Sequence, residues 1–305
     1  MGTLAEMLST PLGVIEWFVY LLAAVMFVIG LHLMNSPKTA RKGNMVSAIG
    51  MVFAVAMAFI VLFAGEASNG FKHGVAVIVL IVGIVIGAVA GVVSAKKVKM
   101  TDMPQLVSVF NTVGGGAAAL VALNDILTSA ETPSIVVLIT AGLGIMIGSV
   151  TFSGSLIAAG KLQGIKWVKK LSLPGKGFWN ILFVVLTIVS FVMLCVQPNQ
   201  RLLWSILTTV FALCYGLVFV IPIGGADMPV VISVLNACTG TAVAMSGLAI
   251  NNIALIVAGA LVGAAGVTLS IAMSKAMNRP LLSVLAGGFG GSNSAAGAGE
   301  GLEGT

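Results

Sequence analysis

Long runs of apolar residues, separated by short polar segments, make up most of the chain. Each run reaches about 20 residues, the length a helix needs to cross the hydrocarbon core of a bilayer. They lack the short alternating pattern of a transmembrane β-barrel. The pattern predicts an all-α, polytopic membrane protein with nine spans, at residues 13–34, 45–64, 74–95, 103–123, 133–159, 177–196, 202–222, 228–249 and 253–274.

The composition agrees with this pattern. Of the 305 residues, 59% are hydrophobic and only 8% are charged, whereas soluble domains average about 25% charged residues. The mean hydropathy is +1.14. These values exclude a soluble globular protein, a disordered chain and a disulfide-stapled secreted module. The N-terminus lacks the basic segment and the small-residue cleavage site of a signal peptide.

Three cysteines, Cys195, Cys214 and Cys238, each lie inside an apolar run without the spacing of metal ligands. We interpret them as small buried hydrophobic residues. The sequence therefore predicts no metal, haem or iron–sulfur site. It also contains no glycine-rich phosphate loop after a strand, so we expect no nucleotide or other cofactor to bind to this chain.

Lysines and arginines lie on alternate loops. The opposite set of loops carries only Lys72 and Arg201, and the richer set carries Lys38, Arg41, Lys42, Lys96, Lys97, Lys99, Lys161, Lys166, Lys169, Lys170, Lys176, Lys275 and Arg279. Cytoplasmic loops are enriched in lysine and arginine. The split predicts an N-terminus outside and a C-terminus in the cytoplasm. The net charge of +6 is then a signal of topology in a lipid bilayer, and we expect no nucleic-acid partner.

The last segment, residues 286–305 (AGGFGGSNSAAGAGEGLEGT), is rich in glycine, serine and alanine. Such a segment cannot bury a core and is typical of a flexible linker. We therefore divide the chain into a transmembrane domain at residues 1–285 and a linker at 286–305. A terminal linker indicates that a further domain normally follows, or that the chain was cut there.

Two segments repeat each other at an offset of 125 residues. Residues 102–120 (DMPQLVSVFNTVGGGAAAL) and 227–245 (DMPVVISVLNACTGTAVAM) are identical at nine of nineteen positions. Both copies start on the predicted cytoplasmic side, so the repeat is parallel. The shared residues include Asp102/Asp227, Pro104/Pro229, Ser108/Ser233, Asn111/Asn236 and Gly115/Gly240.

The spacing within each copy carries a physical interpretation. Serine, asparagine and glycine at i, i+3 and i+7 lie on one helical face. Aspartate followed by proline predicts a helix start, with the aspartate capping the free amides. The polar side chains could simply bond across helices as packing contacts. Because two asparagines lie on matched faces near mid-membrane, we favour a polar pathway between helices.

Hydroxyl groups on the fifth and ninth spans support a polar seam, although each can also bond its own helix. They are Ser149, Thr151, Ser153, Ser155, Thr268 and Ser270. Small residues predict close helix packing, above all at Gly115, Gly240, Gly263 and Gly266. Aspartate, glutamate, lysine and arginine are missing from the centre of every predicted span. Asparagine orients water but holds no proton, so the chain lacks a mid-membrane proton carrier.

Four stretches carry a family resemblance: KVKMTDMPQLVSVFNTVGGGAAAL, GSVTFSGSLIAAGKLQG, PIGGADMPVVISVLNACTG and AGALVGAAG…AMNRPLLSVLAGGFG. Their order and spacing resemble the membrane domain of the beta subunit of proton-translocating NAD(P) transhydrogenase, over nearly the whole chain. The resemblance implies nine helices ahead of an NADP(H) domain. It also implies an enzyme in which inward proton movement drives hydride transfer from NADH to NADP+. This chain would supply the proton path but transfer no hydride by itself.

The resemblance also implies roles for single residues. Asn236, Thr239 and Ser155 match polar positions of the proton path, to which the repeat adds Ser108 and Ser233. Asp227 and Arg279 match positions that couple the membrane domain to the NADP(H) domain.

Asn111 matches a position that is histidine in some members and asparagine in others. In the asparagine kind, a helix of the alpha subunit carries a histidine. The implied partners are therefore an alpha subunit with membrane helices and an NAD(H) domain, an NADP(H) domain after the linker, and a second copy of the complex. The implied location is a bacterial or archaeal cytoplasmic membrane.

Two other functions fit parts of the pattern. A secondary transporter would also use parallel repeats and a polar pair at mid-membrane. The missing central charge argues against it, because such a residue usually binds the coupling ion or a charged solute. A scaffold subunit would leave the matched asparagines and serines without a purpose.

Overall fold

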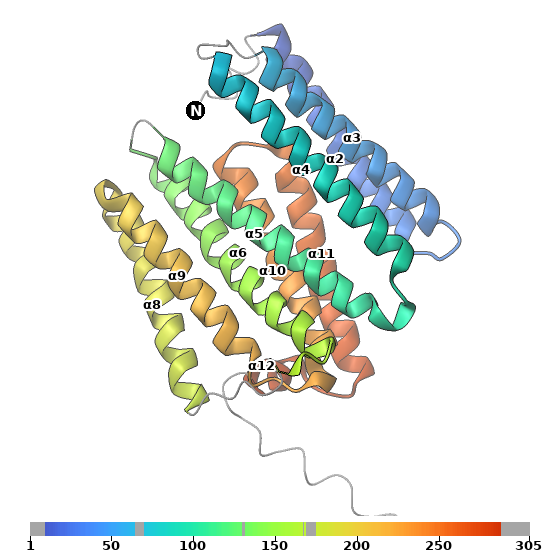
Figure 1. Ribbon diagram of the computed structural model, residues 1–305, viewed down its shortest axis with the longest axis vertical. Coiled ribbons are helices and arrows are strands. Elements are labelled where there is room, and N and C mark those ends of the chain that lie inside the picture. The colour runs from blue at the N-terminus through green and yellow to red at the C-terminus, as the bar shows by residue number, and fades with distance from the viewer. Residues whose placement is uncertain (1–9, 65–69, 130–131, 167, 169–174, 288–305) are drawn as a thin grey trace, which may run out of the picture.

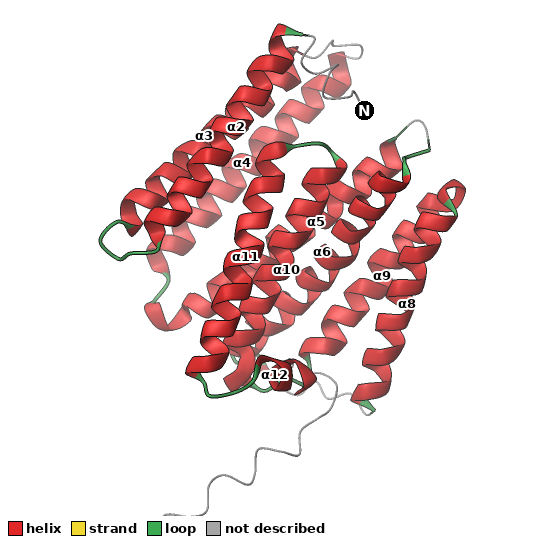
Figure 2. Ribbon diagram, turned by 180° about the vertical axis from the view of Figure 1, so that it is seen from behind, coloured by secondary structure: helices red, strands yellow, loops and turns green. Residues whose placement is uncertain are grey.

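The computed structural model describes residues 10–64, 70–129, 132–166, 168 and 175–287, and its regular elements within these ranges are helices without strands (Figure 2). The prediction of an all-α protein with nine spans is confirmed for this part of the chain. The helices long and apolar enough to cross a membrane are α2 (Pro11–Met34), α3 (Ala40–Ala64), α4 (Gly70–Lys97), α5 (Met103–Thr128), α6 (Ile135–Leu162), α8 (Lys176–Val196), α9 (Arg201–Val220), α10 (Met228–Ala249) and α11 (Ile253–Ala276).

Helix α10 lies at the centre of the bundle and is the most buried of the spans. It packs against α11, α6 and α5, and α6 also contacts α5 and α9. Helices α8 and α9 form one flank, and α2 and α3 lie on the other, where α2 contacts α11 (Figure 1). The spanning window of α4 has no buried residue among those described. The four helices that carry the repeat copies and the hydroxyl-rich spans therefore form the core.

The starts of α5 and α10 differ from the expectation. Pro104 and Pro229 lie in the first turn as predicted, but the prediction that Asp102 and Asp227 cap the helix amides is wrong. Neither carboxylate accepts a bond from its own helix. Each aspartate ends a 3-10 turn, η1 (Met100–Asp102) or η3 (Gly225–Asp227), with ψ of 3° or −8°. A capping side chain needs an extended backbone, so both carboxylates remain available for other contacts.

A short helix that the sequence pattern did not predict, α12 (Leu281–Gly287), follows the last span. Its Val284 is buried in the apolar cluster that includes Met228 at the start of α10. Helix α12 therefore extends two residues into the predicted linker at 286–305, and the remainder of that linker lies outside the described residues.

The repeat extends from single helices to pairs of helices. Hairpin α5–α6 and hairpin α10–α11 make equivalent close contacts. A Cβ on Gly148 of α6 would lie 2.6 Å from the Gly115 carbonyl oxygen, and a Cβ on Gly259 of α11 would lie 2.6 Å from that of Gly240. The first helices correspond at an offset of 125 residues and the second helices at 111. Each hairpin therefore depends on glycine at the same crossing point.

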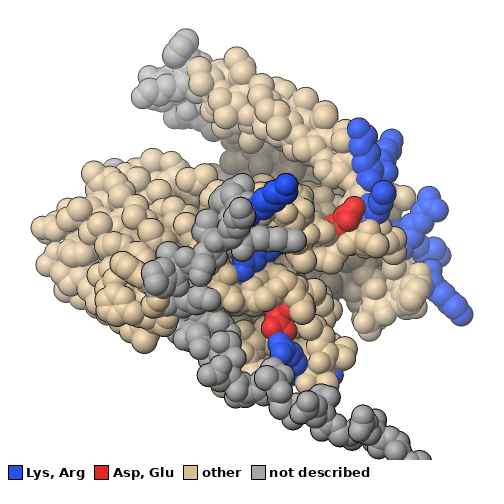
Figure 3. Space-filling view, turned by 60° about the horizontal axis from the view of Figure 1, so that its bottom comes forward, with Lys and Arg blue, Asp and Glu red and all other residues tan. Residues whose placement is uncertain are grey.

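The loops rich in lysine and arginine share one end of the bundle (Figure 1). Figure 3 shows basic side chains gathered on that end. Of the thirteen basic residues assigned to the cytoplasmic side, Lys169 and Lys170 lie outside the described part. The remaining arrangement is the geometry that the positive-inside rule requires.

We predict that this basic end faces the cytoplasm. Exposed Lys97 is the last residue of α4, at the basic end, whereas exposed Asn199 lies between α8 and α9 at the other end. In intact cells a membrane-impermeant thiol reagent should label Asn199→Cys, and Lys97→Cys only after lysis. If position 97 is labelled in intact cells and position 199 is protected, the orientation is the opposite of the predicted one.

Candidate functional site

Two side chains of α5 reach the backbones of α6 and α10 in a buried polar cluster. Ser108 on α5 donates a hydrogen bond from its Oγ to the Ser155 carbonyl oxygen on α6, at 2.7 Å. Asn111, one turn further along α5, donates from its Nδ2 to the Ile232 carbonyl oxygen on α10, at 3.3 Å. Ser108 and Ser155 are completely buried and Asn111 is 5% exposed. The cluster therefore joins both repeat copies with helix α6.

The Ser155 hydroxyl differs from the other hydroxyls of α6. Thr151 and Ser153 donate to carbonyl oxygens of their own helix, at Ile147 and Ser149. The buried Ser155 Oγ has no hydrogen-bond partner among the described residues. A buried polar group without a partner costs about 1–3 kcal/mol. This hydroxyl is therefore available to bond with water or with a polar group of another chain.

Asn236 lies one helical turn beyond Ile232 on α10. Residues four apart on a helix are neighbours on one face, so the amide of Asn111 reaches α10 one turn before Asn236. Asn236 is partly exposed, in contrast to the buried Asn111. The structure thus brings the two repeated asparagines to the same region of the bundle, with Ser155 at its edge.

Ser233 and Thr239 on α10 make packing contacts. Ser233 donates to the Gly266 carbonyl oxygen of α11 at 3.2 Å and accepts from Ser270 at 3.1 Å. Thr239 donates to the Leu235 carbonyl oxygen of its own helix at 3.0 Å. The repeated face of serine, asparagine and glycine is therefore divided. Serine and glycine contact the hairpin partner, whereas Asn111 contacts the other repeat copy.

The predicted packing glycines lie mainly where α10 crosses α11. A Cβ on Gly240 would overlap the backbone nitrogen of Gly263, and a Cβ on Gly266 would lie 2.6 Å from the backbone nitrogen of Ala237. Real Cβ contacts are essentially never shorter than 3.0 Å. The small residues therefore allow the backbones to touch.

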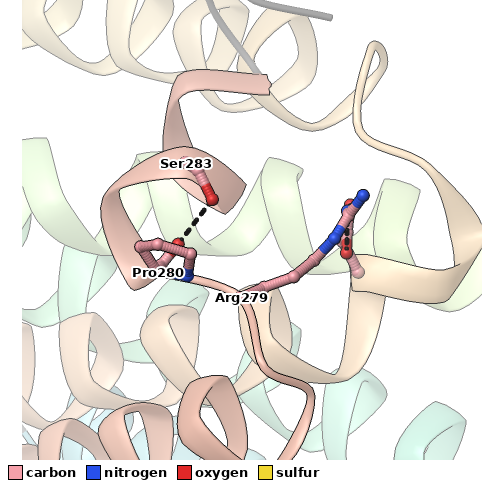
Figure 4. Close-up of polar contacts among 4 residues, drawn as sticks. Arg279, Pro280 and Ser283 are labelled. Carbon is pink, nitrogen blue, oxygen red and sulfur yellow. Dashed lines mark hydrogen bonds and ion pairs between the residues drawn. The ribbon is translucent and has the colours of Figure 1, made fainter. Parts of the chain in front are cut away.

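An ion pair lies at the basic end of the bundle. Arg279, which follows α11, donates from Nη1 to both oxygens of the Asp227 carboxylate, at 2.7 and 2.6 Å (Figure 4). The Arg279 side chain is 42% exposed and the Asp227 side chain 16%. The carbonyl of Arg279 also accepts from the Ser274 hydroxyl at 2.7 Å. These bonds hold the segment before α12 against the start of α10.

Comparison with known proteins identifies the family. The family model described as the NAD(P) transhydrogenase beta subunit matches residues 16–304. The chain belongs to this family. It is also similar to two curated relatives, each named NAD(P) transhydrogenase subunit beta, from Rhodospirillum rubrum and from its strain ATCC 11170, with 39% identity over 287 residues. The match covers 92% of this chain and 59% of each relative, so the chain spans about three fifths of their length.

The described residues do not fit a dinucleotide of the kind the family name implies. A dinucleotide site needs free backbone amides around the phosphates, usually in a glycine-rich turn after a strand. The glycine run Gly114, Gly115 and Gly116 lies inside α5, where its amides are part of the helix. No group of three or more potential metal ligands occurs among the described residues either.

The hydrogen bonds of Lys161 to the end of α9 were not predicted from the sequence. We counted it only as one of the basic residues that indicate topology. In the structure its Nζ donates to carbonyl oxygens at the end of α9 and in the turn that follows. The sequence carried no signal for this contact, because the carbonyl oxygens belong to residues 59 to 62 positions further along the chain.

Proposed function

We propose that this chain is the proton-conducting membrane part of an NAD(P) transhydrogenase, in which inward proton movement drives hydride transfer from NADH to NADP+. Membership of the beta subunit family supports this assignment. The observation that carries the proton path is the buried Ser155 hydroxyl without a protein partner. NAD(H) and NADP(H) bind to other parts of the complete enzyme, and the membrane is a bacterial or archaeal cytoplasmic membrane.

The polar cluster supplies what a hydrated proton path requires. A hydroxyl both donates and accepts hydrogen bonds, and an asparagine amide orients water without holding a proton. Ser155 lies at the edge of the polar cluster, and Asn111 and Asn236 order water next to it. Ser108, Ser233 and Thr239 hold the surrounding helices in place through the bonds to α6, to α11 and within α10.

A partner subunit completes the path. The centres of the described spans contain no aspartate, glutamate, lysine or arginine. Moving an uncompensated charge through hydrocarbon is costly, so a titratable group must come from elsewhere. We assign it to a histidine on a membrane helix of an alpha subunit, which also brings the NAD(H) domain. The complex then pairs with a second copy of itself.

The Asp227–Arg279 pair couples the path to the NADP(H) domain. Asp227 lies six residues before Ser233 on α10, or about 9 Å along the helix, and Arg279 leads toward the C-terminal segment. Passage of protons changes the contacts of this pair and switches the NADP(H) domain between nucleotide exchange and hydride transfer. One charge moving through 100 mV supplies about 2.3 kcal/mol.

Replacing Ser155 tests the path. Ser155→Ala should lower proton-coupled NADPH formation about 10- to 100-fold, the effect of losing one charge-assisted hydrogen bond in the path. Its thermal stability should stay unchanged or rise, because the hydroxyl has no protein partner to lose. The measurements are NADPH absorbance and a pH-sensitive dye, with the complete enzyme in proteoliposomes.

Ser190→Ala provides the matched control. Ser190 on α8 is equally buried and bonds with Thr187 and Thr208. This variant should lose about 1 kcal/mol of stability and keep its activity. Normal coupled activity in Ser155→Ala would contradict the proposed path.

The family assignment leaves the transporter and scaffold alternatives without a supporting observation.

A further inference from the structure

Lys161 lies in the last turn of α6 and contacts the backbone of a different helix. Its Nζ donates to the carbonyl oxygens of Val220 at 3.2 Å, Ile223 at 2.8 Å and Ile221. These carbonyls end α9 or belong to the turn after it. The C-terminal end of a helix carries partial negative charge and carbonyls without helical partners. An ammonium group with three donors is well suited to this position.

The turn held by Lys161 leads directly to Asp227. Ile221 and Ile223 are buried in the apolar cluster with Met228. The next residues, Gly224 and Gly225, have open space around their Cβ positions, so little else restrains them from the side. The amide of Asp227 then bonds to the Gly224 carbonyl at 3.1 Å. Lys161 is therefore a fixed point from which the backbone runs to the carboxylate of the ion pair.

The same helix carries the unpaired hydroxyl of the polar cluster. Ser155 and Lys161 are six residues apart on α6, about 9 Å along the helix axis. A displacement of α6 that accompanies a change in the Ser155 environment would therefore move Lys161 and, through its hydrogen bonds, the α9–α10 turn. The equivalent position in the second hairpin is Ala272, which has no such donor.

We infer that Lys161 is a positioning residue that links α6 mechanically to the Asp227–Arg279 pair. This inference rests on the proposed function, because it assigns to Lys161 the transmission of a change in the proton path to the basic end of the bundle. It acts through the backbone of the turn and not through contact with a proton or a nucleotide.

The test is a double-mutant cycle in the complete enzyme, with proton-coupled NADPH formation as the rate. Lys161→Met keeps the side-chain volume but removes the donors, and should slow this rate about 10-fold. Lys161→Arg keeps donors and charge and should retain most of it. Lys166→Met, an exposed lysine just beyond α6, should have no effect.

The cycle pairs Lys161→Met with Asp227→Asn. If Lys161 acts through Asp227, the double variant should be no slower than the slower single variant, within about twofold. A purely structural lysine would give independent effects whose factors multiply, and this result would overturn the inference. A normal rate in Lys161→Met beside a slow Asp227→Asn would also overturn it.

Assembly and proton conduction are checked separately. If Lys161→Met does not assemble, Lys161→Gln, which keeps one donor group, replaces it in the same cycle. If neither variant assembles, Lys161 is a packing element and the inference is wrong. Failure of the proposed function would show differently, because the unmodified enzyme would then form NADPH without moving protons.

Discussion

Asp227→Asn should uncouple proton movement from NADPH formation while leaving the protein folded. Asparagine has the same shape but is uncharged and accepts one hydrogen bond fewer from Arg279. We expect proton-coupled NADPH formation in the complete enzyme to fall about 10- to 100-fold. A partly exposed ion pair contributes only about 0–1 kcal/mol to stability, so the thermal midpoint should hardly change.

The repeat offers a matched control for this variant. Asp102 occupies the same position in the first copy, but its carboxylate contacts only the Thr101 hydroxyl, at 3.4 Å, among the hydrogen bonds that the structure describes for it. Asp102→Asn should therefore keep its activity. Exchange of the pair, Asp227→Arg with Arg279→Asp, should recover part of the loss. If Asp227→Asn retains normal coupled rates and normal NADPH release, the coupling role is wrong.

The hydropathy pattern predicted the number and order of the spans, because the need to bury about 20 apolar residues per crossing leaves few alternatives. The same pattern could not predict the carbonyl that Asn111 contacts. Which neighbour a helical face meets depends on the packing of the whole bundle, and Ile232 lies 121 residues away. Likewise, a lysine count indicates orientation but does not show that Lys161 bonds to the end of α9.

The relation between the second helices of the two hairpins was also not visible in the sequence. Helices α6 and α11 play the same part toward α5 and α10, yet at the crossing they share mainly Gly148 and Gly259. A backbone-to-backbone crossing requires only the absence of a Cβ at one point, so the remaining side chains are free to differ. The repeat was therefore visible in α5 and α10, where polar side chains are also repeated, and hidden in their partners.

Gly259→Ala should be among the most destabilising single methyl additions in the chain. Its Cβ would lie 2.6 Å from the Gly240 carbonyl oxygen and 2.8 Å from the Ala244 Cα, and it would overlap the Ala244 backbone nitrogen. All three contacts are backbone atoms, which cannot move aside without separating α10 from α11. Forcing an extra methyl group into a packed core costs about 1–3 kcal/mol.

A glycine-to-alanine substitution at a position with open space around the Cβ separates the cost of these backbone contacts from the effect of helix propensity. Alanine stabilises a helix interior by about 1 kcal/mol relative to glycine. Gly87 on α4 has no atom within 4 Å of its Cβ position, so Gly87→Ala should be neutral or stabilising. Thermal unfolding of the purified chain in detergent should give a midpoint several degrees lower for Gly259→Ala and unchanged or higher for Gly87→Ala. Gly148→Ala should resemble Gly259→Ala, because its Cβ would meet the Gly115 carbonyl at the same 2.6 Å. Equal midpoints at positions 87, 148 and 259 would show that neither hairpin depends on its glycine crossing.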